Sequence, residues 1–269
     1  MRTNYKLYDF EKSRARIDKI LSFPTEFEES DNIPSSENLT YSNGKYVKCA
    51  AMFIDLRGST KLIKKTGRKS RTLARIYRAY ISEMVAILNG HRTCQEINIV
   101  GDCVSAIFAG KPLFNRDTPV IEALKASAKC NSMMTVLNKK FKQKYSDFEP
   151  LQAGIGIAYG RALVVKAGFD GSGINDLIYM GDVVNMASKM CNFAYKTFDL
   201  PICVTEGVYN NAGGIVVNHD TGHTFQHMFD QKSNTEYGTV YLGRYFNIEM
   251  NEWNPPLRKN ASLWESLRE

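Results

Sequence analysis

The chain has 269 residues, 43% of them hydrophobic and 23% charged, so it can fill a core and does not have the composition of a disordered protein. Lys and Arg number 35 against 28 Asp and Glu, an excess of seven that suits anionic metabolites, nucleic acid or a plain solvated surface. The six cysteines form no C-x-x-C pair and have no zinc spacing, which argues against a disulfide scaffold and a zinc site.

The beginning of the chain shows no targeting signal. Residues 1–18 alternate charged with aromatic side chains and lack the apolar centre of a signal peptide. No run of the sequence approaches the roughly 18 apolar residues that a membrane-spanning helix needs. We therefore expect a cytoplasmic protein without a membrane partner.

The N-terminal part predicts a short helix and a linker. Apolar and aromatic residues among charges predict an amphipathic helix over 8–21. Residues 23–44, rich in Ser, Asn, Glu and Pro, are typical of a loop. We accordingly expect an N-terminal helical segment and linker over 1–45, a main domain over 46–250 and a polar tail over 251–269.

The main domain alternates strands and helices. The patterns predict, in chain order, a strand (46–56), helices (61–67 and 70–88), a hairpin (96–110), a helix (119–144), a hairpin (151–169), a helix (183–195), a strand (200–205) and a strand-like segment (239–250). Asp55 is expected at the end of the first strand and Asp102 at the tip of the first hairpin. The second hairpin is expected to turn at Tyr159–Arg161. This order predicts an α+β fold, an α/β sandwich with helices over a largely antiparallel sheet.

Two of these strand ends have the chemistry of a metal and phosphate site. In FIDLRGST, Asp55 is followed by Gly58 and by hydroxyl residues at a helix start, where backbone amides favour anions. In VGDCV, Asp102 lies on a tight turn between apolar strands. Two carboxylates on adjacent strand ends can hold two Mg²⁺ or Mn²⁺ ions around a triphosphate. Taken singly, Asp55 also fits a helix cap and Asp102 a plain turn residue.

A third motif, YMGDVVNMASKM, follows downstream. It places Asn185 and Lys189 four residues apart on one helix face, where an amide and a cation could stabilise charge on phosphorus. Polar residues with this spacing are also typical of a solvated helix face.

Together the three motifs resemble those of class III nucleotidyl cyclases. FIDLRGST resembles the family's F-x-D-[IL]-x-G-[FS]-T signature, INIVGDCV its Gly-Asp hairpin and GDVVNMASKM its G-[DN]-x-V-N-x-A-[SA]-[RK] helix. The resemblance runs from about residue 46 to 205. It implies a ferredoxin-like βαββαβ core in a catalytic domain over 46–250, and a head-to-tail homodimer with active sites between the subunits.

The resemblance also implies roles for single residues. Asp55 and Asp102 would bind two metal ions, assisted by the Leu56 carbonyl. Asn185 of the other subunit would orient the ribose and phosphate, with Lys189 at the position of a transition-state Arg. The triphosphate-binding residues would be Arg57, Gly58, Ser59 and Thr60. For Arg57 a base contact and a plainly exposed position remain alternatives, and Lys232 and Arg244 are candidates for a further triphosphate cation.

The base-reading positions depart from the purine cyclases. Asn98 stands where those enzymes have Lys or Glu, and Ile178 where they have Asp, Thr or Cys. These two residues fit neither the adenine nor the guanine pattern, although a divergent purine site remains an alternative. A compact cyclase of this kind resembles the Pycsar cyclases of bacterial anti-phage defence, closest to the uridylate branch. The resemblance implies UTP as substrate, CTP next, and a separate effector protein that binds the cyclic nucleotide.

Three other classes compete with an active cyclase. An inactive cyclase-homology module for nucleotide binding or dimerisation would not need both Asp55 and Asp102. A diguanylate cyclase or polymerase palm is disfavoured because no G-G-[DE]-E-F hairpin occurs. A nucleic-acid binder is disfavoured because its charges should cluster, whereas the basic stretches at 61–71 and 138–144 are expected to be helix or loop faces without stacked aromatic side chains.

Overall fold

The computed structural model describes residues 5–24, 26–59, 70–111, 118–169, 174–213, 216–218 and 222–252. The chain forms two compact units. The larger consists of Cys49–Gly160 with Val183–Glu269, and the smaller of Met1–Lys48 with Arg161–Asp182. Thr60 and the helix predicted over 61–67 lie outside the described residues.

The larger unit is built on a sheet with the strand order β10-β11-β7-β5-β2-β4-β3. The strands are β2 (Asn43–Leu56), β3 (Cys94–Val100), β4 (Cys103–Phe108), β5 (Ala153–Phe169), β7 (Ile202–Thr205), β10 (Phe229–Thr235) and β11 (Gly238–Gly243). The pairings of β2 with β4, β3 with β4, β7 with β11 and β10 with β11 are antiparallel, whereas β5 and β7 are parallel. The prediction of a largely antiparallel sheet is confirmed.

A ferredoxin-like core lies within this sheet. Its elements follow the order β2, α3 (Ser70–Asn89), β3, β4, α4 (Pro119–Lys144) and β5, which is βαββαβ. The corresponding strands lie in the order β5-β2-β4-β3. The predicted α+β class and core topology are therefore both found.

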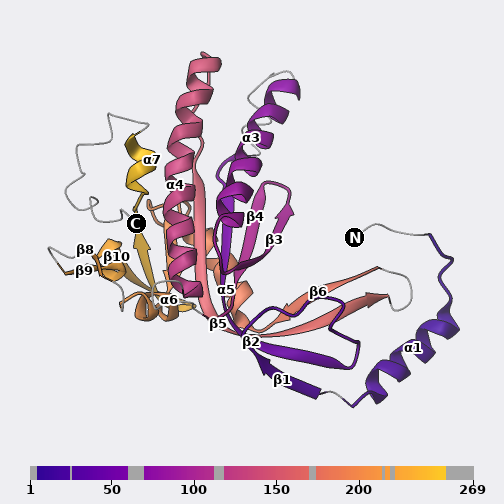
Figure 1. The fold of residues 1–269 in the computed structure, drawn as a ribbon. Helices are drawn as coiled ribbons and strands as arrows, with labels where there is room; N and C mark the ends of the chain where they lie inside the picture. Colours follow the sequence, from indigo (N-terminus) through magenta and orange to yellow (C-terminus); the bar gives the residue numbers. More distant parts are fainter. Residues whose placement is uncertain are drawn as a thin grey trace. The chain divides into compact units, whose positions relative to one another are not determined.

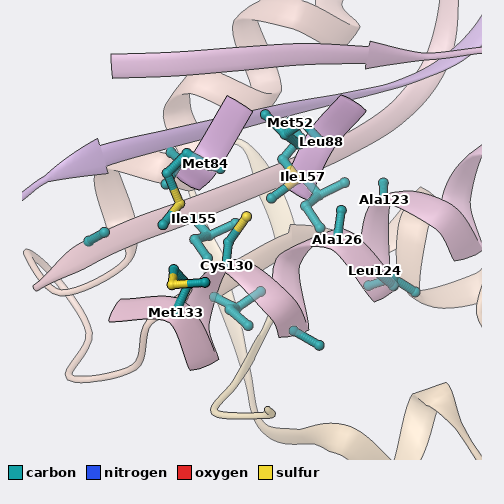
Figure 2. Close-up of a cluster of buried hydrophobic side chains, with 14 of the residues drawn as sticks. Met52, Met84, Leu88, Ala123, Leu124, Ala126, Cys130, Met133, Ile155 and Ile157 are labelled. Carbon is teal, nitrogen blue, oxygen red and sulfur yellow. The ribbon is translucent and has the colours of Figure 1, made fainter. Parts of the chain in front are cut away.

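The main hydrophobic core lies between this sheet and the two long helices. Helices α3 and α4 contact each other and lie side by side (Figure 1). The buried side chains of α3 recur every four residues from Ile76 to Leu88, so one helix face is apolar. Figure 2 shows the core residues Met52 of β2, Met84 and Leu88 of α3, Cys130 of α4, and Ile155 and Ile157 of β5.

Helix α5 (Asp182–Phe193) covers the opposite face of the sheet. Because side chains alternate along a strand, Cys203 of β7 points away from its neighbours Ile202 and Val204 of the main core. Cys203 packs instead with Met190 and Ala194 at the C-terminal end of α5. This arrangement brings that end of α5 close to β5 and β2.

The prediction of a hairpin over 151–169 is wrong. The segment is one long strand, β5, whose outer half pairs antiparallel with β6 (Ile174–Met180). Gly160 does not have the positive φ that a tight hairpin turn demands. The apolar residues from Ala162 to Val165 continue as strand because β6 supplies their hydrogen-bonding partners.

The smaller unit combines segments that are distant in the sequence. It contains α1 (Phe10–Ser22), capped by Asp9, whose side chain accepts a hydrogen bond from the Lys12 amide. The predicted linker contains a strand, β1 (Glu26–Ser30), which pairs parallel with the start of β2. The outer half of β5 and β6 complete this unit.

The remaining elements belong to the larger unit. They are α6 (Glu206–Asn211), β8 (Val216–Asn218), β9 (His223–Thr224), the 3₁₀ helix η1 (Phe225–Met228) and α7 (Ile248–Glu252). The strand predicted over 239–250 is found only as far as Gly243, since α7 occupies its end. Among the helices of the described ranges, none combines the length and apolarity of a membrane span.

Candidate active site

The structure brings Asp55 and Asp102 together. Asp55 is the last residue but one of β2, and Asp102 lies in the two-residue loop between the neighbouring strands β4 and β3. Gly101, which precedes Asp102, has a φ of +65°, the conformation that a type II′ hairpin gives to glycine. Burial raises the pKa of the Asp55 carboxyl, Asp102 raises it further, and Arg57 opposes them. The two carboxylates are thus close enough to repel each other.

The pair of carboxylates fits a divalent cation. The Oδ2 atom of Asp102 is buried and has no hydrogen-bond partner in the part of the chain that the structure describes. A buried, unpartnered carboxylate oxygen is costly unless a cation compensates it. Carboxylate and carbonyl oxygens are the ligands that Mg²⁺ and Mn²⁺ prefer. The Leu56 carbonyl follows Asp55 directly, at the end of β2.

A neighbouring thiol does not join this set of ligands. Cys103 follows Asp102, and burial, with Cys191 and the two carboxylates nearby, raises the pKa of its thiol to about 12. Because Mg²⁺ and Mn²⁺ prefer oxygen ligands to sulfur, we do not expect this thiol to bind them. Within the described ranges, no group of three or more His, Cys, Asp and Glu side chains surrounds a common point.

The chain turns sharply directly after β2. Arg57 and Gly58 form a turn, and Ser59 has helical conformation. Gly58 has a φ of +69° with open space where a Cβ would lie, so the backbone conformation favours glycine here. The Tyr77 side chain of α3 hydrogen-bonds Ser59, and burial followed by the charges of Asp102 and Asp55 raises its pKa. Tyr77 is thus a member of the site that the sequence patterns did not indicate.

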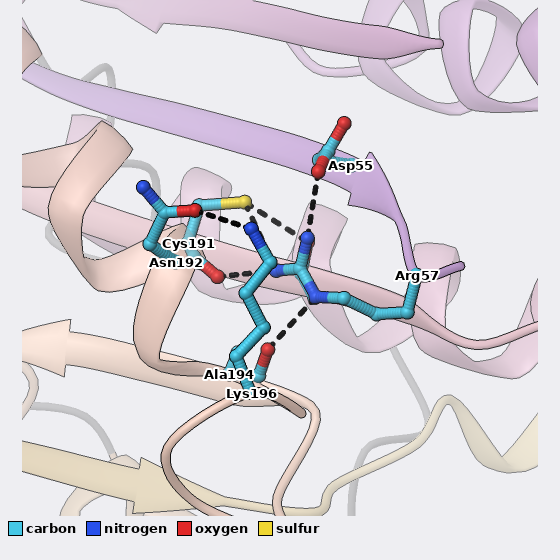
Figure 3. A network of polar contacts seen from close by, with 7 residues as sticks. Asp55, Arg57, Cys191, Asn192, Ala194 and Lys196 are labelled. Atoms are coloured by element: carbon cyan, nitrogen blue, oxygen red, sulfur yellow. Dashed lines mark hydrogen bonds and ion pairs between the residues drawn. The ribbon is translucent and has the colours of Figure 1, made fainter. Parts of the chain in front are cut away.

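Arg57 is turned into the protein. Its Nη1 donates to Asp55 Oδ2 at 2.7 Å and its Nε to the Ala194 carbonyl at 2.9 Å, and its Nη2 donates to the Cys191 carbonyl (Figure 3). Only 7% of the Arg57 side chain is exposed, against 29% of that of Asp55. The alternative of an exposed Arg57 is therefore wrong, because the ion pair and the two carbonyls hold its guanidinium inside.

Helix α5 carries the two residues of the third motif. Asn185 and Lys189 lie one turn apart and are both exposed. The Lys189 ammonium lies 5.2 Å from the centroid of the Tyr237 ring, a cation–π distance. Asn185 lies near the start of α5, whereas the end of the same helix contacts Arg57.

The expected base-reading residues fall in different units. Asn98 on β3 is exposed in the larger unit, and its amide nitrogen donates to Glu96 Oε1 at 2.6 Å. Ile178 on β6 belongs to the smaller unit and is 47% exposed. The two further cations have internal contacts. Lys232 lies over the Tyr241 ring, and Arg244 donates to the Asp199 carbonyl.

Two glycines of β5 are a further sequence feature that indicates this site. Gly154 and Gly156 alternate on β5, so both point to the same face of the sheet. A Cβ on Gly154 would lie 1.7 Å from Arg57 Nη2, and one on Gly156 would lie 1.9 Å from the Cys191 nitrogen. Glycines spaced by two in a strand indicate a close approach, here of the Arg57 guanidinium and of α5.

The chain is similar in sequence to known nucleotidyl cyclases. Residues 42–221 match the family model of the adenylate and guanylate cyclase catalytic domain. The chain is 58% identical over 254 residues to a uridylate cyclase of Gulbenkiania mobilis, covering 94% of this chain and 98% of that protein. It is 34% identical over 246 residues to a uridylate cyclase of Treponema porcinum, covering 91% of this chain and 80% of that one.

The fold similarity extends to solved structures. The adenylyl cyclase CyaB of P. aeruginosa superimposes with a TM-score of 0.59 at 19% identity, over 74% of this chain and 95% of CyaB. Catalytic domains of this class use divalent metal ions, which suits the paired carboxylates at the ends of β2 and β3. The chain therefore belongs to the adenylate and guanylate cyclase catalytic domain family and is a nucleotidyl cyclase.

Proposed function

We propose that this enzyme converts UTP to 3′,5′-cyclic UMP and pyrophosphate with two Mg²⁺ or Mn²⁺ ions. The observation that carries the chemistry is the pairing of Asp55 with Asp102, whose buried Oδ2 has no hydrogen-bond partner in the described residues. The choice of UTP is supported by 58% identity to a uridylate cyclase over nearly the whole chain.

The metal half of the site is the end of β2 and the β3–β4 loop. Asp55, Asp102 and the Leu56 carbonyl would hold the ions. When bound there, divalent ions acidify the 3′-hydroxyl and neutralise charge on the leaving pyrophosphate. The amides of Gly58 and Ser59, together with that of Thr60 outside the described residues, would orient the triphosphate, because backbone amides at the start of a helical turn are donors to anions. The 3′-hydroxyl would lose its proton to solvent, and its oxygen would attack the α-phosphorus in line as the bond from that phosphorus to the leaving pyrophosphate breaks.

The second half of the site would come from another copy of the chain. Within one subunit, the end of α5 that lies near Asp55 is not the end that carries Asn185. Six residues separate Asn185 from Cys191, or about 9 Å along the helix at 1.5 Å per residue. A head-to-tail homodimer would place Asn185 and Lys189 of one subunit over the metal half of the other. There the Asn185 amide would orient the ribose and phosphate, and Lys189 would stabilise charge on phosphorus.

The surface of the smaller unit supports a homodimer. All the exposed large hydrophobic side chains in the described residues belong to this unit, except Ile99, Val100 and Tyr237. Of the apolar residues of this unit that the structure describes, only Leu39, Val47, Ala162 and Val164 belong to the buried core. A unit with so little core and so much exposed apolar surface is typical of a protein–protein contact region.

The base would be read by Asn98 and Ile178. An amide can donate to O4 of uracil and accept from its N3–H, whereas Ile178 offers only an apolar contact. Glu96 can only accept hydrogen bonds, so its contact with the Asn98 amide nitrogen fixes which way the amide points. A fixed amide distinguishes uracil from cytosine, since the two bases reverse donor and acceptor along that edge.

The product would be a second messenger. We propose that cyclic UMP binds a separate effector protein in a cytoplasmic anti-phage response, as the resemblance to Pycsar cyclases implies. The six cysteines are all free thiols, which suits a reducing compartment.

The test is product analysis of the purified enzyme. The protein is incubated with each of the four nucleoside triphosphates and Mn²⁺, and the products are identified by mass spectrometry. We expect cyclic UMP from UTP. A purine or cytidine product alone would refute the proposed base, whereas no cyclic product from any triphosphate would leave only a nucleotide-binding or dimerisation module.

A further inference from the structure

The Arg57 guanidinium joins three segments that are far apart in the sequence. Its Nη1 holds Asp55 at the end of β2, while Nε and Nη2 hold the Ala194 and Cys191 carbonyls at the end of α5 (Figure 3). The Nη2 atom also lies 3.5 Å from the Cys191 sulfur. All three guanidinium nitrogens are therefore bonded to protein atoms.

The third segment, β5, is shaped to admit this side chain. Gly154 leaves the space that Nη2 occupies, since a Cβ there would come within 1.7 Å of it. The Arg57 amide donates to the Gln152 carbonyl just before β5, at 2.8 Å. Both the backbone and the side chain of Arg57 are thus fixed against β5.

The chemistry of the contact requires an arginine. The last carbonyls of a helix lack intrahelical partners and carry partial negative charge, so a cation stabilises them. Arginine presents five N–H donors in a planar fork and can bond a carboxylate and two carbonyls at once. Lysine keeps the charge but has no such fork, so it cannot reproduce the three contacts together.

We propose that Arg57 is a positioning residue, which fixes the Asp55 carboxylate for the metal and ties it to the helix that carries Asn185. Arg57 holds Oδ2 of Asp55, which leaves the other oxygen directed away from the guanidinium. The inference rests on the proposed function in that Asp55 is taken as a metal ligand. It assigns Arg57 to Asp55 and α5 instead of to the triphosphate.

The test compares Arg57→Met with Arg92→Met, a matched control at an exposed turn. Mn²⁺ binding to the protein without nucleotide is measured by electron paramagnetic resonance, and kcat and KM by product formation. We expect Arg57→Met to weaken Mn²⁺ binding about tenfold and lower kcat about 100-fold, as the loss of groups that orient metal ligands does. The nucleotide KM should stay within about threefold, and Arg92→Met should change nothing.

Two other results for Arg57→Met would overturn the proposal. Removing a positive charge beside two carboxylates would by itself strengthen Mn²⁺ binding. Tighter or unchanged binding in Arg57→Met would therefore overturn the proposal. So would a raised KM with unchanged Mn²⁺ binding, which would return Arg57 to the triphosphate.

A second variant keeps the test decisive if Arg57→Met does not fold, which circular dichroism would reveal. Arg57→Lys retains the charge, and we expect Mn²⁺ binding about threefold weaker than in the wild type. Wild-type Mn²⁺ binding in Arg57→Lys would also contradict a positioning role. Failure of the wild type to make any cyclic product would refute the proposed function but leave the Mn²⁺ comparison valid.

Discussion

At the scale of single residues, Asp102, which we propose as a metal ligand, has a structural cost. Its buried Oδ2 lacks a hydrogen-bond partner among the described residues, and its charge acts against that of Asp55. Residues selected for catalysis commonly destabilise the fold in this way. We therefore expect the metal-free protein to be more stable without this charge, whereas the proposed metal site requires it.

We predict that Asp102→Asn abolishes cyclic nucleotide formation but raises the unfolding free energy of the metal-free protein by about 1 kcal/mol. Product formation and urea denaturation in the presence of a chelator would measure the two effects. Asp147→Asn, at an exposed position, should change neither. Retained activity in Asp102→Asn would contradict the role of this residue in metal binding.

The predictability of each site residue depended on where its partners lie. Asp55 and Asp102 could be predicted because a strand end and a Gly-Asp turn are local features. The contacts of Arg57 could not, because its carbonyl partners Cys191 and Ala194 are 134 and 137 residues away in the chain. Tyr77 likewise looked like any other residue of its helix, since only folding brings it to Ser59.

At the scale of elements, β5 can pack closely against Arg57 and α5 because it has glycine at two positions, where no side chain intervenes. Gly154 has no space for a Cβ beside Arg57, whereas a Cβ on Gly160 would meet only the Val183 side chain, 3.5 Å from its Cβ, which is an ordinary contact. The two glycines of one strand therefore make a matched pair of test positions.

Gly154→Ala should lower the unfolding free energy by about 1–3 kcal/mol, because the new methyl group forces the buried guanidinium to move. It should also weaken Mn²⁺ binding, as expected for a change that displaces Arg57. Gly160→Ala should stay within about 0.5 kcal/mol of the wild type. Urea denaturation of both variants measures the difference, and equal stabilities would contradict the close packing at Gly154.

The contact between α3 and α4 contains a buried ionic group that gives the fold a pH dependence. His91, just after α3, lies 2.8 Å from Glu122 of α4, and Lys125 lies 3.1 Å from the same carboxylate. Burial acts to raise the pKa of Glu122, but the hydrogen bond and charge of His91 and the charge of Lys125 outweigh it. They lower the pKa from 4.5 to about 2.

Because the folded state lowers the pKa of Glu122, its contribution to stability is complete above about pH 4.5 and is lost as the pH falls towards 2. At about 1.36 kcal/mol for each unit of pKa, the loss is at most about 3 kcal/mol. Urea denaturation across this range should show a shallower pH dependence for Glu122→Gln than for the wild type. Identical slopes would show that Glu122 is not the titrating group.

At the scale of the whole molecule, the order of helices and strands along the chain can be predicted from the sequence better than their division into two compact units. The ferredoxin-like core follows from alternating strands and helices in one continuous stretch, which sequence patterns detect. The smaller unit could not be predicted, because it joins residues 1–48 to residues 161–182. The prediction of a hairpin in place of the continuous strand β5 fails for the same reason, because the outer half of β5 pairs with β6.

The proposed homodimer makes a prediction that a monomeric enzyme does not. If Asp102 of one subunit works with Asn185 of the other, a mixed dimer of Asp102→Asn and Asn185→Ala subunits has one site with both lesions and one intact site. We therefore expect such a dimer, isolated through two different affinity tags, to have about half the wild-type activity. Each variant alone should be inactive.

A second mixed dimer tests whether the activity of the first comes from a site shared between subunits or from any pairing of two inactive variants. When Asp102→Asn is combined with Asp55→Asn, each site loses one metal carboxylate, so neither site is intact and no activity should return. If Asn185 instead acted with Asp102 of its own subunit, both mixed dimers would be inactive. We therefore expect the first dimer to be active and the second to be inactive. Only a site shared between subunits gives this outcome, because the end of β2 and helix α5 of one chain then belong to different sites.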